Sequence, residues 1–162
     1  MYFSMPVFLP NGNYCLRPQN VTITNMSNVP ILTDAEFEAL VSEGVESIPE
    51  RFLKKLENIA ITIADEPTRA ERKRMGLHGH DTLYGLYEGV PLTLRGENYG
   101  FVLPDKITIF KRPILEDGAG DRARIREIVR DTVWHEIAHY FGYDDPEIEK
   151  REEEGRNHAG DE

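Results

Sequence analysis

Two histidines four residues apart, in the segment His135-Glu136-Ile137-Ala138-His139, are the residues of this 162-residue chain best suited to chemistry. On an α-helix, residues four apart lie above one another on one face, so both imidazoles can reach a single metal ion. Imidazole nitrogens are common ligands of Zn²⁺. Glu136 projects one step round the helix, where it can hold a metal-bound water and take its proton. The segment therefore predicts a zinc site with His135 and His139 as ligands and Glu136 as general base.

The surrounding sequence places this motif inside the molecule. At about 100° per residue, the two histidines project on the same apolar side of the helix as Ile125, Ile128 and Thr132. Buried histidines need polar partners, and a metal ion would supply one. The alternative is that both histidines are core residues satisfied by hydrogen bonds, with Glu136 on the surface.

The residues after the second histidine extend the motif to H-E-x-x-H-x-x-G-x-x-D. Gly142 can adopt the left-handed conformation that ends a helix, and the reversal would bring the chain back over the histidines. Asp145 then stands where metzincins carry a third histidine, and a carboxylate oxygen is equally a zinc ligand. Two histidines, one aspartate and a water would form an open site of the catalytic type.

Other roles stay open for the third ligand and its neighbours. Asp145 is also well placed to be the N-cap of a short helix that starts at Pro146. In that case Asp144 is the next candidate ligand, and Glu149 and His158 are more distant ones.

A hydrolase with this centre also needs a donor to the tetrahedral oxyanion. The residue types that can donate are tyrosine and arginine, although each is equally suited to packing or to the rim of a cleft. The candidates are Arg95, Tyr84, Tyr87, Tyr99, Tyr140 and Tyr143.

The elements that must hold the motif follow an α+β order. Thr33 and Glu36 form a capping box for a first helix, with Gly44 as its stop, and Pro49 begins a second helix. Alternating apolar residues and turn residues then predict strands at 59–63, 83–87 and 107–110, a short helix at 67–75 and a loop at 89–104. Asp121 caps the long motif helix, expected over 121–141. Gly85 in the second strand allows another backbone to come close.

Composition limits the possible functions. The net charge of −10 argues against non-specific binding to nucleic acid or to an anionic membrane. A hydrophobic content of 40% with 30% charged residues is ordinary for a folded soluble domain, and no run of about 18 apolar residues is present. Cys15 is the only cysteine, which excludes an internal disulfide and favours the cytoplasm.

Charge and turn residues divide the chain into three parts. Residues 1–30 contain four prolines and no acid, which predicts an irregular N-terminal extension or sequence upstream of a later start at Met26. Residues 31–150 carry the predicted elements and form one domain. Residues 151–162 are expected to be an acidic, frayed tail.

The stretch from Leu32 to Ile148 resembles the small bacterial zincin-like metallopeptidases. The resemblance rests on four segments: Leu32–Glu38, Leu86–Arg95, Leu103–Phe110 and the motif helix through Asp145. It implies a minimal zincin-like α+β fold, in which a small mixed sheet packs on a long active-site helix with helices before it. It also implies one Zn²⁺ per chain held by His135, His139 and Asp145, with Glu136 as catalytic base.

The resemblance further implies hydrolysis of peptide bonds in a peptide or an unfolded protein. Zincins hold an extended peptide along an edge strand by main-chain pairing, and Leu83–Tyr87 is the candidate edge here. All four methionines precede the helix, so no methionine turn lies beneath the metal, and the 17 residues after Asp145 are too few for the usual lower subdomain. The alternative function is a zinc-binding regulatory or interaction module without turnover. The sequence does not indicate an oligomeric state.

Overall fold

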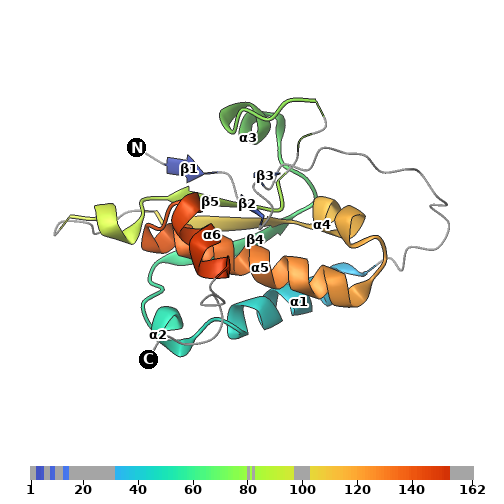
Figure 1. Ribbon diagram of the computed structural model, residues 1–162, viewed down its shortest axis with the longest axis horizontal. Helices are drawn as coiled ribbons and strands as arrows, with labels where there is room; N and C mark the ends of the chain where they lie inside the picture. The colour runs from blue at the N-terminus through green and yellow to red at the C-terminus, as the bar shows by residue number, and fades with distance from the viewer. Residues whose placement is uncertain are drawn as a thin grey trace.

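One long helix, α5 (Arg122–Phe141), runs through the centre of the fold (Figure 1). Every residue from Thr132 to Tyr140 is buried, because the sheet and α1 (Asp34–Glu46) pack around this half of the helix. The structure therefore has the helix predicted over 121–141, capped as expected by the side chain of Asp121.

The structure is a computed structural model that describes residues 3–5, 8–9, 13–14, 32–79, 81, 83–96 and 103–153. The other elements are β1 (Phe3–Met5), β2 (Phe8–Leu9), β3 (Asn13–Tyr14), α2 (Glu50–Leu53), β4 (Ile59–Ala64), α3 (Arg69–Arg74), β5 (Gly85–Gly89), the 3₁₀ turn η1 (Leu92–Leu94), β6 (Asp105–Phe110), α4 (Lys111–Gly118) and α6 (Asp145–Glu153). No helix in the described ranges is long and apolar enough to cross a membrane.

Four strands form one mixed sheet in the order β1-β5-β6-β4. β4 runs parallel to β6, with Ile61 opposite Ile107, whereas β5 is antiparallel to both of its neighbours. β2 and β3 pair with each other in a separate two-stranded sheet. A small mixed sheet packed on a long helix confirms the predicted α+β class and agrees with a minimal zincin-like fold.

Apolar residues cover both faces of the sheet. On one face the isoleucines of β4 and β6 join the core formed by α1 and α5, which includes Phe37 and Trp134. On the other face Leu86 and Phe110 pack with Leu77, in the segment after α3. Figure 1 shows α3 and α1 on opposite sides of the sheet. α5 is therefore held in a layer between the sheet and α1.

The structure differs from the local predictions at three places. Gly44 does not end α1, which continues to Glu46; a Cβ at Gly44 would lie 3.3 Å from Cγ2 of Val133, so this glycine allows the two helices to pack closely. The helix after Pro49 has only four residues. α4 was not predicted, because Pro113 and Gly118 are typical of turns, although proline is tolerated in the first turn of a helix.

β5 starts two residues later than predicted, at Gly85. A Cβ on this glycine would lie 2.5 Å from Oε1 of Glu136 and 2.8 Å from Cγ2 of Thr132. The close approach expected at Gly85 is therefore real, but side chains of α5 make it rather than another backbone.

β5 is also not an edge strand along its whole length. β1 pairs with the stretch from Tyr87 to Gly89, so the expected edge is covered there by the chain itself. Among the described strands, none pairs with Gly85 or Leu86 on that side. Only this short stretch of the predicted edge can receive another strand without displacing β1.

We expect Gly85→Ala to lower the free energy of unfolding by about 1–3 kcal/mol, because the added methyl group overfills a packed site. Gly96→Ala is the matched control, since a Cβ there would meet no atom within 4 Å. Urea denaturation followed by circular dichroism measures both variants. A loss below about 0.5 kcal/mol for Gly85→Ala would contradict the steric role of this glycine.

Candidate metal centre

The end of α5 turns the chain back over its own histidines. Gly142 has a φ of 91°, in the left-handed region that favours glycine. The N–H of Tyr143 donates to the carbonyl of Ala138 at 3.1 Å and closes the turn. A Cβ on Gly142 would lie 2.1 Å from Oγ1 of Thr93, so no side chain fits there. The glycine stop predicted from the sequence is present, and the reversal leads directly to Asp145.

Three metal-ligating side chains meet at this turn. The ligand atoms of His135, His139 and Asp145 all lie within 4.8 Å of one another. Oδ1 of Asp145 is 3.4 Å from Nε2 of His135 and 3.2 Å from Nε2 of His139. Both histidines are 1% exposed, whereas the Asp145 side chain is 15% exposed. Of the three, Asp145 is therefore the nearest to solvent.

The arrangement of these atoms fits a zinc ion. Ligand atoms about 2.0–2.2 Å from a tetrahedral zinc lie about 3.3–3.6 Å from one another, which matches both distances from Asp145. The third separation, up to 4.8 Å, must shorten for the two histidines to share the ion. Nδ1 of His139 lies 3.1 Å from the carbonyl oxygen of Tyr143, which can only accept, so Nδ1 carries the proton. The lone pair of Nε2 is then available. This buried Nε2 makes no hydrogen bond to the described residues. Asp145 lies within ion-pair distance of it, but the two groups are not aligned for a hydrogen bond.

The electrostatics of Asp145 suit a ligand. Burial alone would raise the pKa of this carboxyl, but its interactions with His135 and His139 outweigh burial and lower the pKa. The group is therefore held in its ionised form, which is the form that binds a metal ion.

The role of helix cap belongs to Asp144. Its Oδ1 accepts from the N–H of Glu147 at 3.0 Å, and the Glu147 carboxylate accepts from the N–H of Asp144 at 3.1 Å. This capping box starts α6, so the interpretation of Asp145 as the cap is wrong. The cap leaves Asp145 free to face the histidines, and it occupies Asp144, the alternative ligand. The side chains of Glu149 and His158 lie outside the described part of the structure.

Glu136 is completely buried against β5. The alternative that placed it on the surface is therefore wrong. Neither of its carboxylate oxygens makes a hydrogen bond to the described residues. Burial raises the pKa of Glu136 to about 8, while the charge of His135 and the nearby backbone N–H of Tyr87 lower it only in part. A buried carboxyl with a pKa raised in this way is typical of a proton-transfer group.

A buried polar network behind the centre was not predicted from the sequence. The Arg95 guanidinium donates to Oδ2 of Asp105 at 2.5 Å, and the Tyr87 hydroxyl donates to the same oxygen at 2.6 Å. Arg95 also donates to the hydroxyl of Tyr140 at 3.3 Å and lies over its ring at 4.7 Å. Nothing in the sequence around Arg95 or Asp105 distinguishes them from surface charges. The network links the loop after β5 to α5, directly beside His139.

Residues that belong to this network are not free to donate a hydrogen bond to the oxyanion. Arg95, Tyr87 and Tyr140 use their polar groups within it, which removes them as candidates. Tyr84 is 1% exposed. Tyr143 is partly exposed, with the Arg151 guanidinium 4.3 Å from its ring centroid, and Tyr99 lies outside the described residues. Tyr84 and Tyr143 are thus the candidates that the described part of the chain leaves.

The pKa of Glu136 makes the stability of the metal-free protein depend on pH. The folded protein keeps this carboxyl protonated up to about pH 8, whereas the unfolded chain loses the proton near 4.5. The contribution of Glu136 to the free energy of unfolding is therefore fully present below about pH 4.5, and it is lost as the pH rises through 8.

We expect the midpoint temperature of unfolding of the metal-free protein to fall by roughly 5–10 °C between pH 5 and pH 8. Glu136→Gln replaces the carboxyl with a neutral side chain of the same shape and should flatten this part of the profile. Differential scanning calorimetry in EDTA measures both proteins. An equally steep fall in the glutamine variant would assign the pH dependence to other groups.

Comparison with known proteins agrees with this centre. The family model of the zincin-like metallopeptidases matches residues 56–155, which is more than half of the chain and includes β4, β5, β6, α5 and the turn at Gly142. A search of curated proteins found no match. Because the family model covers three strands of the sheet, α5 and the candidate metal centre, the chain belongs to the zincin-like metallopeptidase family.

Proposed function

We propose that the protein hydrolyses peptide bonds with one zinc ion held by His135, His139 and Asp145 and with Glu136 as the general base. The observation that carries the proposal is the buried carboxyl of Glu136 beside three converging ligand groups. A purely structural zinc site has no use for this carboxyl, and burying it is costly. The family match supports metallopeptidase chemistry in general.

The residues divide the chemical work between them. When bound, Zn²⁺ lowers the pKa of a water molecule and polarises the scissile carbonyl. Glu136 takes a proton from the attacking water at its carboxylate and returns it to the leaving nitrogen. His139 is held in the ligating tautomer by the carbonyl of Tyr143. Tyr143, the partly exposed one of the two remaining candidates, is the proposed donor to the oxyanion.

The position of β5 supports an extended peptide as substrate. Glu136 lies against Gly85, at the end of β5 that has no second neighbour among the described strands. A peptide that bonds to the backbone of Gly85, whose N–H and carbonyl point away from β6, would place its own backbone beside Glu136. We therefore propose a peptide or an unfolded segment of a protein as substrate, in a reducing compartment such as the cytoplasm, since Cys15 is the only cysteine. The net charge of −10 does not suit nucleic acid or anionic membranes as partners.

Zinc binding tests the ligand set. We expect about one zinc per wild-type chain by elemental analysis, and a loss of zinc affinity of more than roughly 100-fold in Asp145→Ala, which removes a ligand. Asp144→Asn is the control, because it removes the neighbouring carboxylate but keeps the ligands and an oxygen that can cap α6; it should retain zinc. Retention of zinc by Asp145→Ala would move the third ligand elsewhere.

Activity tests the role of Glu136. We expect Glu136→Gln to keep one zinc and the native fold while cleavage of a broad peptide library falls by about 10²–10⁴-fold, because the proton acceptor is lost. Mass spectrometry of the products measures cleavage. If the zinc-loaded wild type cleaves no peptide, the regulatory or interaction module becomes the better explanation.

A further inference from the structure

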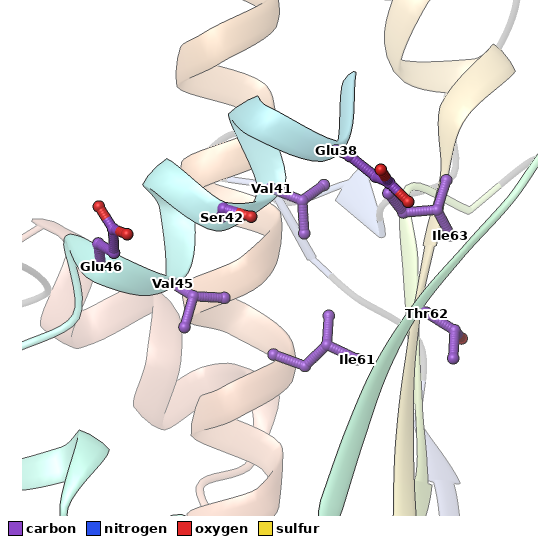
Figure 2. Close-up of a pocket in the computed structure, with 8 residues that line it drawn as sticks. All are labelled: Glu38, Val41, Ser42, Val45, Glu46, Ile61, Thr62 and Ile63. Atoms are coloured by element: carbon purple, nitrogen blue, oxygen red, sulfur yellow. The ribbon is translucent and has the colours of Figure 1, made fainter. Parts of the chain in front are cut away.

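A groove lies between α1 and β4, the strand at the end of the sheet opposite β1. Its volume is about 680 Å³. Figure 2 shows the residues that line it, from two elements only: Glu38, Val41, Ser42, Val45 and Glu46 of α1, and Ile61, Thr62 and Ile63 of β4. None of them belongs to the metal centre or to the buried network.

The backbone of β4 is available for pairing along this groove. The N–H of Asp105 donates to the carbonyl of Asn58, and with the parallel register of β4 and β6 this fixes which residues bond to β6. Ala60 and Thr62 direct their backbone groups toward β6, whereas Ile61 and Ile63 direct theirs away from it. No other strand of the described structure pairs with β4.

The side chains give the groove an apolar floor and an acidic rim. Val41 and Val45 face Ile61 across the floor (Figure 2). Glu38 and Glu46 are exposed and line the same groove. β4 carries no proline and no charged residue, the two features that usually protect an edge strand from pairing.

We propose that this groove binds an extended peptide that adds as a strand to β4 and carries two basic side chains facing Glu38 and Glu46. Glu38 and Glu46 are eight positions apart, which spans about 12 Å along a helix. Basic residues four positions apart on a strand span about 13 Å on one face, which matches this spacing. The peptide's apolar side chains cover Val41, Val45 and Ile61.

Charge decides between a basic peptide and a second copy of the chain. Antiparallel pairing of two β4 strands would bring two α1 helices with exposed Glu38 and Glu46 to one interface, where like charges repel. A basic peptide is attracted by the same residues. The proposal does not rest on the proposed hydrolysis, since the groove shares no residue with the metal centre.

A labelled nine-residue peptide tests the proposal, with lysines at positions 3 and 7, valine at position 5 and threonines at the even positions. Fluorescence anisotropy with the full chain should show saturable binding in low salt, unchanged by EDTA. The same peptide with glutamates at positions 3 and 7 should not bind. Two further versions carry N-methyl groups on odd or on even residues, and only one of them should lose binding, because a strand pairs through one edge. Binding by both or by neither would overturn strand addition.

Paired variants of the protein test the site. We expect Glu38→Lys with Glu46→Lys to weaken peptide binding by roughly tenfold in low salt. Glu57→Lys with Glu127→Lys is the control, since it changes the net charge equally at exposed residues outside the groove. An equal loss of peptide affinity in both double variants would mean that the peptide responds only to the overall charge of the protein, which would overturn the proposed site.

Hydrogen exchange locates the bound strand. The amides of Ile61 and Ile63 should exchange quickly in the free protein and become protected with the peptide, while those of Ala60 and Thr62 are protected throughout. Protection of Ile61 and Ile63 without peptide would mean that a second copy or another part of this chain covers β4. Sedimentation would distinguish these two occupants, and either of them would overturn the proposal.

Discussion

The rest of the structure is arranged around one contact, between the fully buried carboxyl of Glu136 and strand β5. The carboxyl lies against the backbone of β5 at Gly85, where no Cβ fits. Because α5 must come this close to the sheet, both faces of its second half are enclosed, and the helix is apolar on sides that are usually polar in a surface helix. Gly44 also allows a close approach, on the opposite side of α5, because the missing Cβ lets α1 come near Val133. Two glycines without turn roles thus set the thickness of the helix layer.

The position of α5 along its own axis is fixed at both ends. Asp121 caps the N-terminal end, and the turn at Gly142 is held by Thr93 from the 3₁₀ turn η1. The network of Arg95, Asp105 and Tyr140 fastens the same end to the loop after β5. A buried ion pair of this kind adds little net stability, but removing one partner leaves an uncompensated charge. Its effect here is to hold the backbone beside His139 in one arrangement.

The sequence predicted the parts of this fold that depend on local chemistry. The capping box at Thr33, the long helix and the left-handed glycine all follow from interactions within a few residues, and all are present. Gly44 and Gly85 were recognised as special, but their partners are more than forty residues away, so their roles could not be derived locally. The two aspartates before α6 have the same side chain and differ by one position. Only the turn geometry assigns the cap to Asp144 and turns Asp145 toward the histidines.

The residues that converge at the metal centre have very different separations along the chain. His135, His139 and Asp145 lie within 11 consecutive residues, whereas the backbone that encloses Glu136 is some fifty residues away. An unfolded or partly folded chain therefore keeps the two histidines and the aspartate near one another and retains part of its affinity for zinc. Ligand binding stabilises a fold only by the difference between its affinities for the folded and unfolded states. Under the proposed function, zinc is captured early during synthesis and contributes less to folding stability than its affinity would suggest, and Glu136 can take a proton only once the sheet has closed over it.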